Sequence, residues 1–178
     1  MTKEYVDRYE DPIVVKYVTD LYNDIIQVFT RIVSRNKWTA NKTRLNAVKK
    51  LEKIEFIAGH YPYDRILNDP DLEYTSDFYE NMMKVVNWRA NKFIDLVGKK
   101  TIEMPLIDWQ QTPPKLVGTQ AYVVNAAYTP SKNNIFVNLG YMQKPFVDLV
   151  ERGIEYNLAH IGFTLGHEMS HALDDWGS

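Results

Sequence analysis

The sequence predicts a mainly α-helical protein with a small β-hairpin, and three observations carry that prediction. Apolar residues recur at helical spacing in three long stretches of the first 100 residues. Two short runs of β-favouring residues flank the turn-forming stretch Pro130-Ser131-Lys132-Asn133. A fourth amphipathic stretch, over about residues 153–175, follows near the end of the chain. At 178 residues, the chain is long enough to bury one core of ordinary size.

The three helices predicted in the first half cover residues 12–35, 39–58 and 76–97. Pro12 suits the first turn of a helix, because its missing N–H would have no partner there. Thr39 and Ser76 are residue types that accept hydrogen bonds from the first free N–H groups of a helix, so we expect them to cap the second and third helices. Gly59 and Gly98 are expected to end these helices, since glycine tolerates the left-handed backbone found at helix ends.

The composition changes after Lys100, where prolines punctuate an irregular stretch. Two strands are then predicted, over residues 121–128 and 135–138, and they form the hairpin. We therefore divide the chain into a helical region, residues 1–100, and a second part, residues 101–178, that holds the hairpin and the last helix.

Composition and charge exclude several classes of function. A formal net charge of −2 gives no electrostatic case for binding nucleic acid. The chain has no cysteine, which excludes disulfides, a cysteine nucleophile and thiolate metal ligands. It has no run of 18 apolar residues, so we expect no membrane contact from this segment. No signal peptide follows Met1, because the next residues are charged.

The last predicted helix carries the motif His167-Glu168-Met169-Ser170-His171. Residues four apart lie on one face of a helix, so both imidazoles can bind a single Zn²⁺ ion. Glu168 lies beside them, where it can take a proton from a zinc-bound water. This is the arrangement of a zinc protease. The alternative is two ordinary histidines on a helix face beside a solvated glutamate.

Other polar residues of this helix are assigned by their spacing. Asp174 follows His171 by three residues and could accept a hydrogen bond from an imidazole N–H, which would present the other nitrogen to the metal; the alternative is an aspartate in water at the helix end. His160 precedes His167 by seven residues, about 10 Å along the axis, and is assigned to packing or to the surface. Glu151 and Glu155 lie too far along the same helix to join the site.

A catalytic zinc needs a third protein ligand, and the spacing excludes one common type. A third histidine would stand six residues after His171, where this chain has Gly177. The remaining common option is a glutamate from a later helix, beyond Ser178.

Several segments, taken in order, resemble the neprilysin-like (M13) zinc metallopeptidases. The segments are Gly59-His60-Tyr61-Pro62, Val124-Asn125-Ala126-Ala127-Tyr128, Asn134-Ile135-Phe136-Val137 and the stretch from Gly166 to Asp175. The departures affect packing more than chemistry: Ala127 replaces a usual aromatic residue, Ala172-Leu173 a usual Gly-Phe, and His160 a usual glycine.

The resemblance implies the fold and the roles of individual residues. It implies a truncated thermolysin-like (gluzincin) catalytic half preceded by a helical segment, and thus an interior fragment of a larger protein. In that family the substrate strand binds the peptide backbone, which implies roles for the Asn125 side-chain amide and the Ala126 main chain. The alternative for Asn125 is a strand-end residue bonded to its own backbone.

The expected activity is zinc-dependent hydrolysis of peptide bonds, with Glu168 as general base, His167 and His171 as metal ligands, and one Zn²⁺ per site. The expected partners are peptide substrates and the missing C-terminal part of the same protein, and the 178 residues alone are expected to be inactive. The resemblance suggests an extracellular or membrane-anchored ectodomain. The rival hypothesis is a non-catalytic structural or interaction protein that keeps a protease-like fold.

Overall fold

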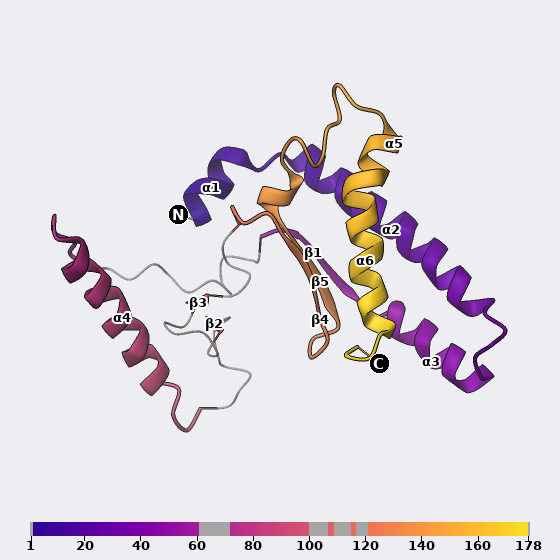
Figure 1. Cartoon of the computed structure of the whole chain (residues 1–178), viewed down its shortest axis with the longest axis horizontal. Helices are drawn as coiled ribbons and strands as arrows, with labels where there is room; N and C mark the ends of the chain where they lie inside the picture. The colour runs from indigo at the N-terminus through magenta and orange to yellow at the C-terminus, as the bar shows by residue number, and fades with distance from the viewer. Residues whose placement is uncertain (1, 61–71, 100–106, 109–114, 117–120, 178) are drawn as a thin grey trace. The chain divides into compact units, whose positions relative to one another are not determined.

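The computed structural model describes residues 2–60, 72–99, 107–108, 115–116 and 121–177 (Figure 1). The chain forms two compact units. The first unit combines Met1–His60 with Gln120–Ser178, and the second comprises Tyr61–Thr119. The mainly helical class with a small sheet is confirmed, whereas the predicted division into residues 1–100 and 101–178 stays a prediction.

The first unit begins with three helices, α1 (Thr2–Tyr9), α2 (Pro12–Ser34) and α3 (Asn41–Leu51). The Asp11 side chain caps α2 by accepting a 2.8 Å hydrogen bond from the Ile13 N–H, and Pro12 occupies the first turn. The helix predicted over residues 12–35 is thus confirmed. The sequence pattern did not predict α1. The predicted Thr39 cap is wrong, because the residue before α3 is Ala40, which offers no side-chain cap.

The helix predicted to run to residue 58 is also wrong beyond Leu51. Residues Glu55–Gly59 instead form strand β1, which pairs in parallel with β5 (Asn134–Asn138). These residues form a strand because the edge of β5 supplies hydrogen-bond partners. Such long-range pairing overrides the local helix propensity.

The sheet of the first unit has the strand order β1-β5-β4, so β5 is central and β4 (Ala126–Thr129) lies at an edge. β4 and β5 are antiparallel and are joined by a turn in which Asn133 has φ 49°, a left-handed conformation that asparagine tolerates. The predicted hairpin is confirmed, but its first strand starts at residue 126 and not at residue 121.

The last predicted helix forms as a chain of four helical pieces. They are α5 (Ile154–Asn157), the π-helical turn η4 (Leu158–Gly162), α6 (Phe163–Ser170) and the 3₁₀ turn η5 (His171–Leu173). Its inward side chains Ile161, Leu165 and Met169 are fully buried and join one core with residues of α2 and the sheet. In Figure 1 this yellow helix crosses α2, and its end lies beside the sheet. The core thereby fixes the position of α6 against β4.

The second unit holds α4 (Phe78–Ile94) and a two-stranded antiparallel sheet, β2 (Ile107–Asp108) with β3 (Lys115–Leu116). The third predicted helix is confirmed, but its cap is Asp77 and not Ser76, since Asp77 accepts a 2.9 Å hydrogen bond from the Glu80 N–H. Gly98 follows α4 with φ 81°, as expected near a helix end. The prolines at 105, 113 and 114 lie outside the described residues. Within the described ranges, no helix is both long and apolar enough to cross a membrane.

Candidate functional site

His167 and His171 lie one turn apart where α6 passes into η5. Their Nε2 atoms are 3.2 Å apart, and the two rings are nearly perpendicular at 86°. Tetrahedral zinc with bonds of about 2.0–2.1 Å to nitrogen would separate two such ligand atoms by roughly 3.3 Å. The two imidazoles therefore already have the spacing that a shared metal ion requires.

Asp174 makes the contact predicted for it. The Nδ1–H of His171 donates to Asp174 Oδ2 at 2.6 Å, an assignment of the proton that follows from the acceptor-only carboxylate. This bond raises the pKa of His171 and lowers the pKa of Asp174. With Nδ1 protonated, neutral His171 presents the lone pair of Nε2 on the side facing His167.

A tight turn after η5 holds Asp174 in place. Asp174 Oδ1 accepts hydrogen bonds from the N–H groups of Trp176 at 3.0 Å and Gly177 at 2.9 Å. A Cβ atom on Gly177 would lie 1.8 Å from the carbonyl oxygen of His171, which is backbone and cannot swing away. Only glycine fits at position 177 in this turn. Gly177, which stands where a third histidine ligand would be expected, is therefore required by the backbone of this turn.

Glu168 is 8% exposed and is bound by the sheet. Its Oε2 accepts a 2.8 Å hydrogen bond from the backbone N–H of Tyr128 on β4. Oε1 has no hydrogen-bond donor among the residues that the structure describes. One carboxylate oxygen is thus fixed, and the other remains able to accept a proton. Sequence reasoning did not identify the Tyr128 N–H, because a backbone donor has no signal in the residue type.

The outer edge of β4 faces Glu168. Asn138 donates its N–H to Asn125 O at 3.0 Å, which makes residues 125 and 138 a hydrogen-bonded pair. In an antiparallel ladder the next pair, Ala126 with Val137, then directs its backbone groups away from the partner strand. The Tyr128 N–H follows the same rule, since it bonds Glu168 and not β5. The main-chain groups of Ala126 and the carboxylate of Glu168 therefore share one edge of the sheet.

Asn125 and Ala126, the two predicted substrate-binding residues, differ in exposure. Asn125 is exposed, and its side chain makes no hydrogen bond to any part of the chain that the structure describes. Asn125 therefore does not form the hydrogen bond to its own backbone that was the alternative. Ala126 is 7% exposed, because its methyl group belongs to the core.

The polar residues that the sequence excluded as ligands have separate contacts. His160 is exposed and stacks on Tyr156 with 4.0 Å between ring centroids, and its Nδ1 lies 2.8 Å from Tyr156 O, so its assignment to packing or to the surface is confirmed. Glu151 precedes α5 and does not lie on the helix as predicted; it pairs with Lys144 at 3.4 Å. Across the described ranges, no group of three or more His, Asp or Glu side chains is placed to hold one metal ion. The spacing of the two imidazoles suits zinc, but the described residues provide only these two ligands.

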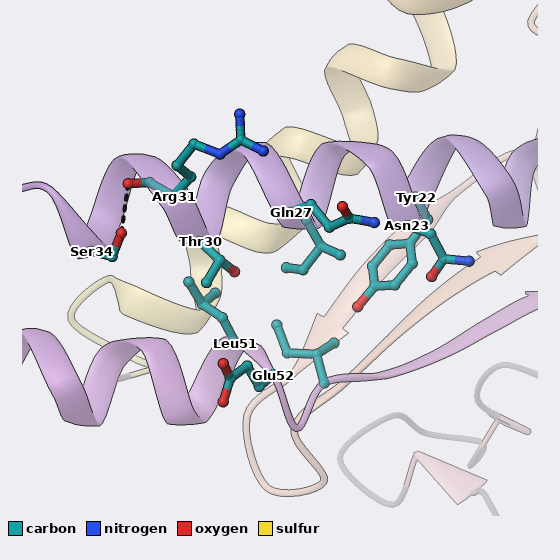
Figure 2. Close-up of a pocket in the computed structure, with 10 residues that line it drawn as sticks. Tyr22, Asn23, Gln27, Thr30, Arg31, Ser34, Leu51 and Glu52 are labelled. Carbon is teal, nitrogen blue, oxygen red and sulfur yellow. Dashed lines mark hydrogen bonds between the residues drawn. The ribbon is translucent and has the colours of Figure 1, made fainter.

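A separate groove lies between α2 and the end of α3 (Figure 2). Its volume is about 560 Å³, and polar side chains, such as Asn23 and Gln27 of α2 and Glu52 just after α3, line it together with Tyr22 and Leu51. It contains no histidine and none of the residues of the metal site, so it is distinct from the candidate site.

Comparisons with known proteins agree on one family. Residues 125–178 match the model of peptidase family M13. The chain is 33% identical over 168 residues to an endothelin-converting enzyme homolog of Locusta migratoria, covering 89% of this chain and 21% of that protein. It is 32% identical over 171 residues to human endothelin-converting enzyme 1, covering 89% and 20%. It is 30% identical over 168 residues to a neutral endopeptidase of Lactobacillus helveticus, covering 90% and 23%. The chain thus spans about a fifth of the length of these curated relatives.

Two solved structures have the same fold over nearly the whole chain. The crystal structure of PepO from Lactobacillus rhamnosis matches with a TM-score of 0.71 and 24% identity, over 99% of this chain and 26% of that one. Zinc metalloprotease Zmp1 of Mycobacterium tuberculosis, solved with an inhibitor, matches with a TM-score of 0.71 and 25% identity, over 99% and 24%.

Proposed function

We propose, from the premise that this chain belongs to the neprilysin-like peptidases of family M13, that its α6 and β4 form part of a zinc site that hydrolyses peptide bonds. The predicted thermolysin-like (gluzincin) architecture is confirmed by the likeness of fold to the solved members. The observation that carries the proposal is a pair of imidazole nitrogens 3.2 Å apart, next in sequence to a buried glutamate that the sheet holds.

In this proposal His167 and His171 are zinc ligands through Nε2, and Asp174 orients His171. The third ligand is a glutamate supplied from outside these 178 residues. Bound zinc would polarise the scissile carbonyl and lower the pKa of a coordinated water toward 7. The 178 residues alone should then bind zinc weakly and hydrolyse nothing, because two ligands do not make the usual three-ligand site.

Glu168 is proposed to act as general base. The Tyr128 N–H holds Oε2, so the proton would be received at Oε1 and later passed to the leaving amine. Because the N–H anchor comes from the same strand edge that is proposed to bind substrate, the base and the peptide would be held by one element.

The peptide itself is proposed to bind along the edge of β4. An extended peptide adds to an exposed strand edge through main-chain hydrogen bonds, and Ala126 directs its backbone groups to that side. The exposed amide of Asn125 would then bond the peptide backbone. In the complete protein with zinc bound, Asn125→Ala should lower kcat/KM about tenfold and leave the zinc content unchanged, within the range of about 1–3 kcal/mol for a hydrogen bond left unpaired. An unchanged kcat/KM would remove Asn125 from the site.

Zinc titration of this chain is the direct test. Isothermal titration of zinc should give one weak site that His167→Ala and His171→Ala each abolish, whereas the control His160→Ala leaves it intact. Retention of the site in both histidine variants would overturn the proposed ligands.

The rival function is a non-catalytic protein with a protease-like fold. The two-ligand set found in the described residues favours it. It requires no proton acceptor at position 168, so it expects Glu168→Gln to leave the protein's properties unchanged apart from stability.

A further inference from the structure

The segment before β4 forms a bulge on the edge of the sheet. Gly140 donates its N–H to Ala121 O at 2.7 Å, and Asn138 donates its N–H to Asn125 O at 3.0 Å. Between these two bonds, three residues of the segment therefore lie opposite the single residue Leu139. The surplus residues project outward, and Tyr122, Val123 and Val124 are 42%, 39% and 51% exposed.

Gly140 fixes the shape of this bulge. A Cβ atom at position 140 would lie 2.6 Å from the carbonyl oxygen of Tyr122 and 2.9 Å from that of Val123. Both atoms are backbone, so no larger residue fits without moving the bulge. Tyr122 thus has a backbone position set by close packing against the segment that follows β5.

Helix α1 brings two more tyrosines to Tyr122. The rings of Tyr5 and Tyr9 are 4.7 Å apart, and the rings of Tyr5 and Tyr122 meet edge to face at 6.2 Å. Val6, next to Tyr5, is 3% exposed and ties α1 to the core of the first unit. These rings, together with Glu4 and Arg8, line an open hollow of about 270 Å³. We refer to this hollow as the tyrosine pocket.

The lining of the tyrosine pocket favours an aromatic occupant. Aromatic rings attract a further ring in edge-to-face or offset geometry. The two charged lining residues, Glu4 and Arg8, have opposite signs, and the Arg8 guanidinium lies 5.5 Å from the ring of Tyr9. They give no net preference for a charged side chain. A cavity of about 150 Å³ is enough to hold benzene, so this pocket has room for a phenyl or phenol ring.

The bulge places the tyrosine pocket close to the proposed substrate edge. The span from Asn138 to Gly140 is at most about 7 Å, so the backbone at residues 121–122 is about that far along the edge from Asn125. An extended peptide advances about 3.3 Å per residue. We propose that the tyrosine pocket binds an aromatic side chain of the substrate peptide, about two to four residues from the peptide residue opposite Ala126. This inference rests on the proposed function, because it names the substrate class of the same strand edge.

The test measures peptide binding without hydrolysis. Fluorescently labelled eight-residue peptides, in which a single phenylalanine is moved along a serine–alanine background, are bound to the 178-residue chain in EDTA and followed by anisotropy. One phenylalanine position should bind about tenfold tighter than its serine counterpart. Tyr122→Ala should remove that preference, Tyr122→Phe should keep it, and the matched control Tyr79→Ala on α4 should leave it unchanged.

The outcomes separate the tyrosine pocket from the proposed function. Equal binding of all peptides, no binding of any peptide, or a preference that survives in a folded Tyr122→Ala variant overturns the pocket. Circular dichroism of each variant verifies that it is folded. Cleavage is measured separately on the complete protein with zinc bound, because the 178 residues alone are expected to hydrolyse nothing. An aromatic preference in binding without cleavage would support the tyrosine pocket and overturn the proposed hydrolytic function. Cleavage without any aromatic preference would support the hydrolytic function and overturn the tyrosine pocket.

Discussion

Helices α6 and α4 have similar sequence patterns and different surroundings. Both are amphipathic and carry a glutamate, yet α6 buries Leu165 and Met169 completely, whereas α4, every residue of which the structure describes, buries none. Glu168 on α6 is 8% exposed and bonded to a strand, while the side chain of Glu80 on α4 is 52% exposed and pairs with Lys84. Periodicity predicts a helix in both cases, but only packing against a sheet turns a glutamate into a candidate for catalysis.

The largest expected difference between the two helices is in hydrolysis. In the complete protein with zinc bound, Glu168→Gln should lower kcat by at least about 100-fold, because general-base catalysis contributes roughly 10²–10⁴-fold. Its zinc content, measured by metal analysis, should stay the same, since Glu168 is not a ligand in the proposal. Glu80→Gln is the matched control and should change neither quantity. Loss of zinc together with activity in Glu168→Gln would make Glu168 a ligand or a structural residue.

Truncating a buried side chain of α6 should destabilise the protein more than truncating an exposed side chain of α4. Leu165→Ala removes a fully buried side chain and should lower the free energy of unfolding by about 2–5 kcal/mol, because it leaves a cavity. Met82→Ala on α4, where the side chain is 42% exposed, should cost less than about 1 kcal/mol. Urea unfolding of both variants measures this. Equal losses would mean that α4 is as firmly packed in solution as α6.

Two glycines on either side of the histidine pair differ in the space around them. Gly177→Ala should weaken zinc binding about 10–100-fold, the usual effect of losing a partner that orients a metal ligand, because the turn holding Asp174 cannot close over His171. Gly166→Ala is the control within α6, since a Cβ there meets no atom within 4 Å, and it should leave zinc affinity unchanged. Zinc competition with a chromophoric chelator compares them. Equal affinities in the two variants would show that the Asp174 turn does not orient His171.

Much of the site was predictable because it is local in sequence. The four-residue spacing of the histidines and the three-residue spacing from His171 to Asp174 define contacts that helix geometry fixes. The Tyr128 N–H was not predictable, because its role depends on the register of β4 and on its place at the sheet edge. Strand β1 was missed since residues 52–58 satisfy both a helical and an extended pattern, and only pairing with β5 decides between them.

The smallest expected effect concerns acid pH. Hydrogen bonds from the N–H groups of Glu151 and Val150, followed by Lys144, lower the pKa of the buried Asp148 to about 2, while Lys84 and Thr75 lower the pKa of the exposed Glu80. A carboxyl with a depressed folded-state pKa adds stability above its unfolded pKa, roughly 3.9 for aspartate, and loses that contribution as pH falls through the folded value. Asp148→Asn should therefore lower Tm at pH 7, and the gap to the original chain should close between about pH 4 and pH 2.

Thermal unfolding at several pH values follows that gap, with Glu80→Gln as the exposed counterpart that should show little difference at any pH. A gap for Asp148→Asn that is the same at pH 2 as at pH 7 would show that the charge of Asp148 does not stabilise the fold.

The π turn at Leu158–Gly162 has a consequence for how this helix tolerates changes in chain length. A π turn closes its backbone hydrogen bonds over five residues and not four, so it holds one residue more than a regular helix needs. Deleting Ala159 can therefore be absorbed by reversion to ordinary α-helical bonding, with the segments on either side keeping their faces. Deleting one residue between His167 and His171 rotates one imidazole by about 100° away from the other. Insertions and deletions in homologous chains should accordingly collect at 158–162 and spare 167–171. An engineered Ala159 deletion that loses zinc binding would contradict this.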